Sequence, residues 1–131
     1  MPDTVNFIII DDSKLDCFIA DKIIRNTGKA GDIKSFTVAA EALDFISKAP
    51  PPVSDKTNVL LDIQMPVMNG FEFVEAFEKL PEDIRNGYNV YMLSSSINEN
   101  DLNRVKHYPS IKQFLNKPLT SSALAQVLEG L

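Results

Sequence analysis

Short apolar runs alternate along the chain with longer segments in which apolar residues recur at helical spacing. Residues 5–10 (VNFIII) form a nearly continuous apolar run. Such a run is typical of a β-strand that is buried on both faces. Residues 15–24 then predict an amphipathic helix, because apolar side chains recur three and four positions apart. The expected apolar stripe of this helix comprises Leu15, Phe18, Ile19, Ala20, Ile23 and Ile24.

The same alternation continues to the end of the chain. Further strands are predicted at residues 32–36, 58–61, 88–93 and 111–115, and further helices at 38–47, 71–80, 99–107 and 120–128. Five strands that alternate with five helices predict an α/β fold, a parallel sheet covered by helices on both faces. No repeat or second core interrupts the pattern. We therefore expect one domain over residues 1–131, with residues 1–4 as an N-terminal tail.

Proline and glycine separate the predicted elements. Residues 50–52 are three consecutive prolines, which stop a helix and favour a stiff surface loop. In the loop at residues 65–70, Pro66 is expected to set a turn, and Gly70 is able to adopt a positive φ.

Composition and charge narrow the classes of function. The net charge of −5 argues against a nucleic-acid partner and against an anionic membrane surface. Cys17 is the only cysteine, which excludes an intrachain disulfide and a multi-thiolate metal site. The N-terminus has no signal-peptide pattern, and no apolar run approaches the roughly 20 residues that span a bilayer. We expect a soluble, cytoplasmic protein without a membrane partner.

Polar side chains follow four of the five predicted strands. Asp11 and Asp12 follow the first strand, Asp62 the third, Ser94 the fourth and Lys117 the fifth. In an open parallel sheet, ligands bind beyond the carboxyl ends of the strands, so these groups should converge. Clustered carboxylates repel one another unless a cation neutralises them. An all-oxygen cluster of this kind favours Mg²⁺.

The hydroxyl and the ammonium extend this site towards phosphate chemistry. Phosphoryl transfer depends on positioning and on charge stabilisation, which Mg²⁺, Lys117 and Ser94 could supply. Asp62 is then the candidate nucleophile, because a carboxylate can form an acyl phosphate. Taken singly, each group has a structural alternative: an acidic pair can cap a helix, and a lone aspartate, serine or lysine can lie in a surface loop. Their joint occurrence at four strand ends favours the phosphoryl site.

Four motifs at these strand ends also match a known family. They are IDDS at residues 10–13, LDIQMPVMNG at 61–70, LSS at 93–95 and NKP at 116–118. Over residues 5–131 the chain resembles the receiver domain of two-component response regulators. The resemblance implies a flavodoxin-like three-layer sandwich, with a five-stranded parallel sheet in the order 2-1-3-4-5 and five helices.

The resemblance assigns roles to the acidic residues. It implies that Asp62 accepts a phosphoryl group from a phosphohistidine, carried by a histidine kinase or a histidine phosphotransfer protein. Asp12 and Asp62 would bind Mg²⁺ directly and the backbone carbonyl of Gln64 would be a third ligand, while Asp11 would act mainly through water. The domain would be a stoichiometric phosphoacceptor that catalyses its own phosphorylation and dephosphorylation.

The remaining motif residues would hold the phosphoryl group and couple phosphorylation to a change at the protein-binding surface. The resemblance implies that Ser94 and Lys117 hold phosphoryl oxygens, and that the peptide bond between Lys117 and Pro118 is cis. It implies a switch in which Phe114 turns inward when the Ser94 hydroxyl moves towards the phosphoryl group. A downstream protein would then bind residues 99–107, the fifth strand and the last helix.

Two positions beside the expected phosphoryl group, Gln64 and Ser96, differ from the best-studied chemotaxis pattern. They influence how water reaches the acyl phosphate, and we expect slow to moderate self-dephosphorylation, over minutes or longer. Gln64 also argues against a first alternative function, an aspartyl-phosphate phosphatase. Such an enzyme needs an acid at this position, and glutamine is not one. A second alternative is a degenerate receiver that serves only as an interaction module.

Overall fold

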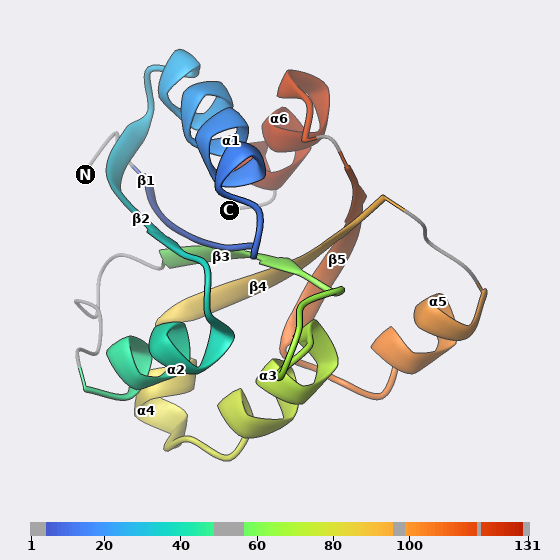
Figure 1. Cartoon of the computed structure of the whole chain (residues 1–131). Coiled ribbons are helices and arrows are strands. Elements are labelled where there is room, and N and C mark those ends of the chain that lie inside the picture. The colour runs from blue at the N-terminus through green and yellow to red at the C-terminus, as the bar shows by residue number, and fades with distance from the viewer. Residues whose placement is uncertain (1–4, 49–56, 96–98, 118, 130–131) are drawn as a thin grey trace.

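The computed structural model describes residues 5–48, 57–95, 99–117 and 119–129, and Figure 1 shows their arrangement. The strands are β1 (Val5–Ile10), β2 (Ala30–Phe36), β3 (Thr57–Asp62), β4 (Tyr88–Ser94) and β5 (Ile111–Asn116). The helices are α1 (Lys14–Asn26), α2 (Ala39–Lys48), α3 (Gly70–Phe77), α4 (Glu82–Arg85), α5 (Glu99–Val105) and α6 (Ser121–Glu129). No helix among the described residues is long and apolar enough to cross a membrane.

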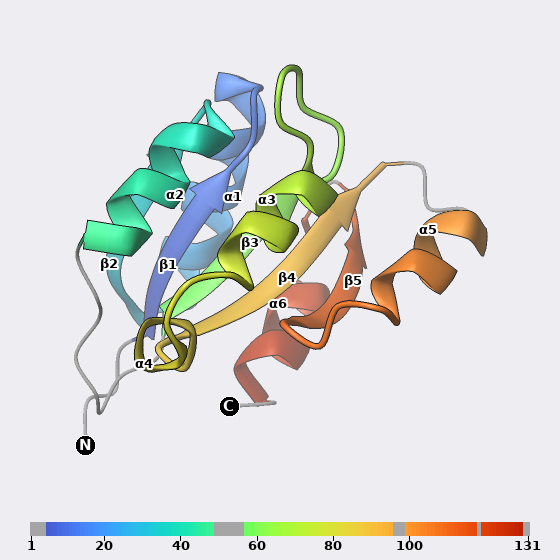
Figure 2. The ribbon, with the colours of Figure 1, turned by 90° about the horizontal axis from the view of Figure 1, so that it is seen from below.

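The five strands form one parallel sheet in the order β2-β1-β3-β4-β5, so the predicted fold class and strand order are confirmed. Helices α1 and α6 cover one face, and α2 and α3 cover the other (Figure 1). The strands run in the same direction, and the loop that joins β3 to α3 projects beyond their carboxyl ends (Figure 2). Ligand sites of open parallel sheets lie at this end.

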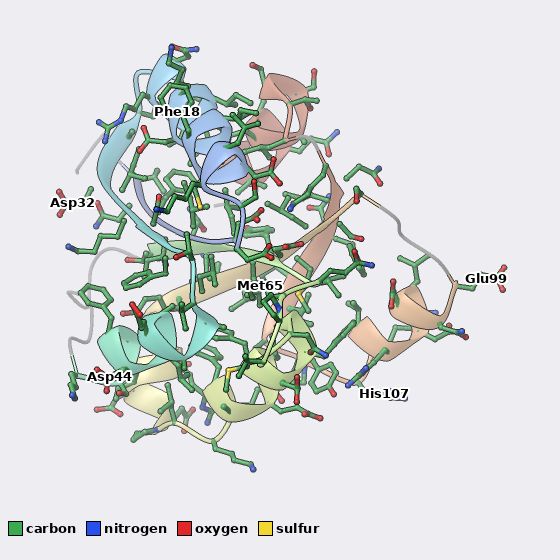
Figure 3. The ribbon with its side chains drawn as sticks, in the orientation of Figure 1. Phe18, Asp32, Asp44, Met65, Glu99 and His107 are labelled. Atoms are coloured by element: carbon green, nitrogen blue, oxygen red, sulfur yellow. The ribbon has the colours of Figure 1, made fainter. Side chains whose placement is uncertain are left out.

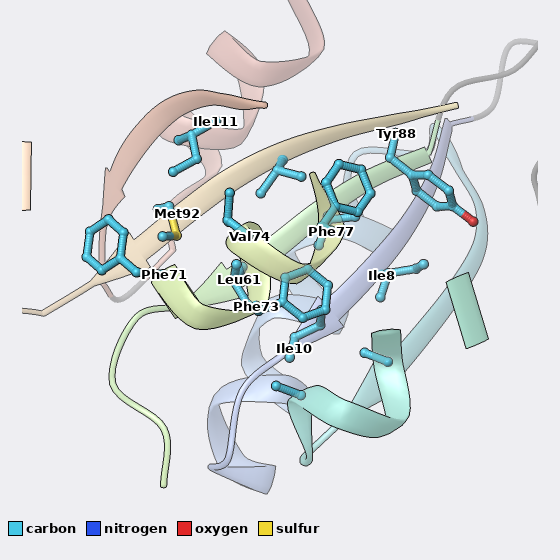
Figure 4. Packing of buried hydrophobic residues seen from close by; sticks show 14 of the residues in the cluster. Ile8, Ile10, Leu61, Phe71, Phe73, Val74, Phe77, Tyr88, Met92 and Ile111 are labelled. Atoms are coloured by element: carbon cyan, nitrogen blue, oxygen red, sulfur yellow. The ribbon is translucent and has the colours of Figure 1, made fainter. Parts of the chain in front are cut away.

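Two apolar clusters hold the helices on the sheet, one on each face. Side chains of a strand alternate between the faces, so Ile8 and Ile10 of β1 pack towards α2 and α3, and Phe7 and Ile9 towards α1 and α6. Figure 4 shows the first cluster, in which aromatic residues of α3 lie over the central strands. Every residue of β3 and β4 is buried, which explains why apolar residues predominate in both strands, although Asn58 and Asn89 are buried as well.

The number of helices differs from the prediction of five, since the described part of the chain contains six. The additional helix, α4, is a single turn of four residues after Pro81. None of its residues is buried, and Ile84 alone packs part of its side chain against the core. A single turn has no second apolar position at helical spacing, so the sequence pattern could not reveal it.

The predicted apolar stripe of α1 is wrong at its outer edge. Leu15 and Phe18 are 65% and 57% exposed, while Cys17, Ala20 and Ile24 form the buried face. The stripe in the sequence is therefore wider than the surface that the sheet covers. It leaves two large apolar side chains on the solvent side of α1.

Candidate functional site

The strand register brings the predicted site residues to one end of the sheet. Asp62 is the last residue of β3, and Ser94 is the last residue of β4 and pairs with Asn116 of β5. The sheet hydrogen bonds extend one residue further at both flanks. The Asp11 N–H donates to the Phe36 carbonyl at 3.0 Å, and the Lys117 N–H donates to the Ser94 carbonyl at 2.9 Å. The backbone that carries each functional group is thus fixed by its neighbouring strand.

Three carboxylates form the acidic part of the site. Ligand oxygens of Asp11, Asp12 and Asp62 lie within 4.8 Å of one another. Asp11 and Asp62 are 2% and 5% exposed, whereas Asp12 lies at the exposed rim. Hard carboxylate oxygens at this spacing fit a divalent cation that retains part of its water shell, as Mg²⁺ does.

The Lys117 ammonium is the positive part of the site and contacts three carboxylates. Its Nζ lies 2.6 Å from Asp11 Oδ2, 3.1 Å from Asp16 Oδ2 and 3.3 Å from Asp62 Oδ1. The contacts with Asp11 and Asp62 bring together the ends of β1, β3 and β5, as the sequence predicted. The contact with Asp16 was not predicted, although Asp16 lies three and four residues before the inward-facing Ile19 and Ala20. One indication of this contact was available in the sequence: Asp16 lies on the face of the α1 helix that also carries Ile19 and Ala20 and therefore turns towards the sheet.

The electrostatics of the site leave an excess of negative charge. Burial raises the pKa of Asp62 to about 6, and repulsion by Asp11 contributes to the same direction. Lys117 and a 3.3 Å hydrogen bond from the Gln64 N–H oppose this shift without cancelling it. For Lys117, burial favours the neutral amine, but hydrogen bonds to Asp11 and Asp16 outweigh it and raise the pKa. One ammonium therefore does not neutralise the cluster, and a bound cation would.

The segment after β1 shows that the acidic pair does not cap α1. Ser13 is the N-cap, and its hydroxyl accepts the Asp16 N–H at 3.2 Å. Asp11 Oδ1 accepts the Ser13 N–H at 2.9 Å, which orients this carboxylate while Oδ2 contacts Lys117. The helix-cap alternative for the acidic pair is therefore wrong, and a serine performs that task.

The loop from β3 to α3 brings the start of a helix against the backbone of Asp62. A Cβ on Gly70 would lie 2.9 Å from the Asp62 carbonyl oxygen and 2.9 Å from Ile63 Cα, so only glycine fits. Gly70 does not use the positive φ that glycine permits, and the left-handed residue of this loop is Val67, with φ 69°. Asn69 then begins α3 with a reciprocal capping box.

The other predicted residues have different positions relative to the cluster. The Ser94 side chain is buried at the end of β4, and the Gln64 side chain is exposed. Phe114 is partly buried and packs against the core cluster below α3. Ser96 and the peptide bond to Pro118 lie outside the described residues, so the expectations for them stay predictions.

Helix α5, part of the expected output surface, and the segment that follows it both contact α3. None of its residues is buried. The Arg104 guanidinium lies 4.3 Å from the ring centre of Phe71, and the Tyr108 hydroxyl donates to Glu75 at 2.8 Å. Figure 3 shows Glu99, the first residue of α5, pointing away from the sheet. The helix is therefore held by the cation–π contact of Arg104 and by Val105, whose partly buried side chain packs against the core cluster, and Tyr108 anchors the segment that follows it.

Fold and site together define a doubly wound α/β protein with an acidic centre and a lysine at the carboxyl ends of its strands. The chain belongs to the response regulator receiver domain family, whose model matches residues 7–129. It is thus a receiver domain of the kind found in two-component response regulators.

Solved structures of the family resemble the chain over nearly its whole length. A response regulator receiver protein from Dyadobacter fermentans shares 34% identity with a TM-score of 0.83, and the match covers 97% of each chain. A two component response regulator from Cytophaga hutchinsonii shares 27% identity with a TM-score of 0.84, covering 97% of this chain and 96% of that one. The Vibrio cholerae chemotaxis protein CheY4, at 21% identity and a TM-score of 0.77, covers 97% and 98% and shares the fold.

Proposed function

We propose that this receiver domain is a phosphoacceptor in which Asp62 takes a phosphoryl group from a phosphohistidine in a Mg²⁺-dependent reaction. The donor is a histidine kinase or a histidine phosphotransfer protein. The observation that carries the proposal is the contact of the Lys117 ammonium with Asp62 Oδ1, at 3.3 Å, beside a cluster of three carboxylates. This combination offers a nucleophile, a positive charge and a metal-binding group within one small volume.

The transfer follows from the chemistry of these groups. The Asp62 carboxylate, with a pKa raised to about 6, is mostly ionised at neutral pH and attacks the phosphorus in line with the leaving imidazole. A P–O bond forms, the P–N bond breaks, and the electron pair returns to the donor imidazole nitrogen, which takes a proton. Lys117 and the Ser94 hydroxyl stabilise the charge on the phosphoryl oxygens. Mg²⁺, held directly by Asp12 and Asp62 with the Gln64 carbonyl as a further expected ligand and Asp11 acting mainly through water, would neutralise the remaining charge.

The residues near Asp62 favour a stoichiometric acceptor over a turnover enzyme. A phosphatase that works through an aspartyl phosphate needs an acid to protonate its leaving group. The residue two positions after Asp62 is Gln64, whose amide cannot perform this step. We therefore propose that the domain catalyses its own phosphorylation and slow dephosphorylation, and that phosphorylation changes a protein-interaction surface formed by α5, β5 and α6.

Phosphorylation by a small donor tests the proposal directly. The protein is incubated with Mg²⁺ and acetyl phosphate, and its intact mass is measured. We expect a gain of one phosphoryl group in the wild type and none in Asp62→Asn or after chelation of the metal. Asp44→Asn, which removes an exposed carboxylate of α2, is the matched control and should be labelled like the wild type.

Each alternative function has its own outcome in the same assay. Turnover of a phosphoester substrate would favour a phosphatase, and a complete absence of labelling would favour a pure interaction module. After removal of the donor, the label should persist for minutes or longer, and loss within seconds would contradict the expected effect of Gln64 and Ser96.

A further inference from the structure

We propose that Asp16 is a positioning residue that, together with Asp11, holds the Lys117 ammonium in place while one N–H of the lysine passes from Asp62 to the incoming phosphoryl group. This inference rests on the proposed function and adds a residue that none of the four sequence motifs contains. Asp16 would act through Lys117 alone, without binding the metal ion or the phosphoryl group.

The number of contacts at the ammonium is the first argument. A lysine ammonium has three N–H donors, and Lys117 has three carboxylate partners, one each from β3, α1 and the residue after β1. Each donor thus has one available acceptor. Asp16 makes its contact both as an ion pair and as a hydrogen bond of 3.1 Å.

The lengths of the contacts show which partner is exchanged most readily. The distance from Nζ is shortest to Asp11, intermediate to Asp16 and longest to Asp62. Once Asp62 carries the phosphoryl group, the same ammonium must donate to a phosphoryl oxygen. The two shorter contacts can persist during this exchange, so the lysine nitrogen need not be repositioned.

The position of Asp16 separates it from the metal site. The three carboxylates close enough to share a cation are Asp11, Asp12 and Asp62, and Asp16 is outside this group. Asp16 lies in the first turn of α1, where its N–H donates to the Ser13 hydroxyl and the following residue, Cys17, is buried. Its backbone is therefore well fixed, although 41% of its side chain is exposed.

A neighbouring cavity limits the size of the expected effect. A cavity of about 20 Å³, lined in part by Asp11, Asp16 and Lys117, has room for one water molecule. Water could replace the lost acceptor in a truncated variant but would not hold the ammonium as firmly. We expect Asp16→Ala to slow phosphorylation by about 3- to 10-fold, at or below the effect usual for groups that orient a functional residue.

The kinetic experiment measures phosphorylation by acetyl phosphate over a range of donor and Mg²⁺ concentrations. Asp16→Ala should lower the rate at saturating donor while the Mg²⁺ concentration for half-maximal rate stays unchanged. Asp16→Asn keeps an oxygen acceptor and should stay within about 2-fold of the wild type. Asp21→Ala, five residues further along α1, is the matched control and should not change the rate.

A double-mutant comparison tests whether Asp16 acts through Lys117. In a Lys117→Ala background, Asp16→Ala should cause no further loss, because the group that it positions is absent. The proposal is overturned if Asp16→Ala leaves the rate unchanged, lowers it equally in both backgrounds, or shifts the dependence on Mg²⁺.

A second measurement stays informative even if the wild type takes no label, an outcome that would refute the proposed function alone. In NMR spectra of isotope-labelled lysine, the Lys117 ammonium should give a protected signal, assigned by its loss in Lys117→Ala. Asp16→Ala should broaden or remove this signal by faster exchange with water, and Asp16→Asn and Asp21→Ala should retain it. An unchanged signal in Asp16→Ala would refute the positioning role.

Discussion

At the scale of single residues, Asp62 bears its charge in an unfavourable environment. Its carboxylate is almost completely buried and lies beside the carboxylate of Asp11, while Lys117 provides partial compensation. A nucleophile that water solvates poorly has less hydration to lose when it reacts. The same environment makes the folded protein sensitive to pH.

The pKa of Asp62 predicts that, without divalent metal, the contribution of this carboxyl group to the stability of the domain falls as the pH rises from about 4 to 7. The folded-state pKa of about 6 lies above the ordinary value of 3.8, so the folded state binds the proton more tightly in this interval. The loss should be on the order of 2 kcal/mol at neutral pH. Urea unfolding at several pH values, with a chelator present, measures it.

Asp62→Asn is the reference for this measurement, because it removes the carboxylate and leaves other titrating groups in place. The difference in the free energy of unfolding between the two proteins should change with pH over this interval. A difference that is constant from pH 4 to 7 would contradict the prediction.

Val67 predicts a gain in stability on substitution. It is fully exposed, yet its φ of 69° lies in the left-handed region, which costs a β-branched residue about 1–2 kcal/mol. Val67→Asn should raise the free energy of unfolding by about 1 kcal/mol, because asparagine tolerates this conformation. Val67→Ile keeps the branched Cβ and should give no gain in the same denaturation experiment.

At the scale of elements, the contact between α3 and the end of β3 sets the position of Asp62. The Gly70 N–H donates to the Ile63 carbonyl at 2.9 Å, so the first turn of α3 rests on the backbone next to the nucleophile. The asparagine cap and its capping box fix where this helix begins. The helix therefore holds the site as well as covering the sheet.

Gly70→Ala should disturb both stability and phosphorylation. The new Cβ would meet backbone atoms, which cannot rotate away as a flexible side chain could. We expect a loss of about 1–3 kcal/mol, as for other overpacked positions, together with slower phosphorylation of Asp62. Thermal unfolding and the labelling assay measure the two effects, and a variant as stable as the wild type would show that the backbone can yield.

The elements also show what the sequence could reveal. The central strands were predictable because burial on both faces leaves mostly apolar side chains, as at residues 59–61 and 90–93, before the polar residue at each strand end. The edge strand β2 begins two residues earlier than predicted, since Ala30 and Gly31 carry no apolar alternation. The contact between Asp16 and Lys117 depends on the rotation of α1 over the sheet, which no local pattern encodes.

At the scale of the whole molecule, the site depends on four strands that come from distant parts of the chain. Their order and register follow from parallel pairing, so the convergence of Asp11, Asp62, Ser94 and Lys117 was predictable once the strands were identified. The conformations of the loops that follow these strands could not be predicted from the sequence. A ligand at this end of the sheet contacts β1, β3 and β5 together and should stabilise the folded chain as a unit.

Addition of Mg²⁺ is therefore predicted to raise the unfolding temperature at neutral pH. A free concentration of about ten times the dissociation constant should add about 1.4 kcal/mol, because the ion binds the folded state alone. Asp12→Asn removes the exposed carboxylate of the cluster and should reduce this shift. An equal shift in this variant would place the ion elsewhere.

The weak attachment of α5 has a consequence for hydrogen exchange. Its amides should exchange with deuterium much faster than those of β3 and β4, whose residues are all buried and which should exchange only when the whole domain unfolds. Helix α5 can then open and close many times during one lifetime of the folded core. Because local opening of α5 requires little free energy, phosphorylation of Asp62 can change this surface while the sheet that holds Asp62 stays folded.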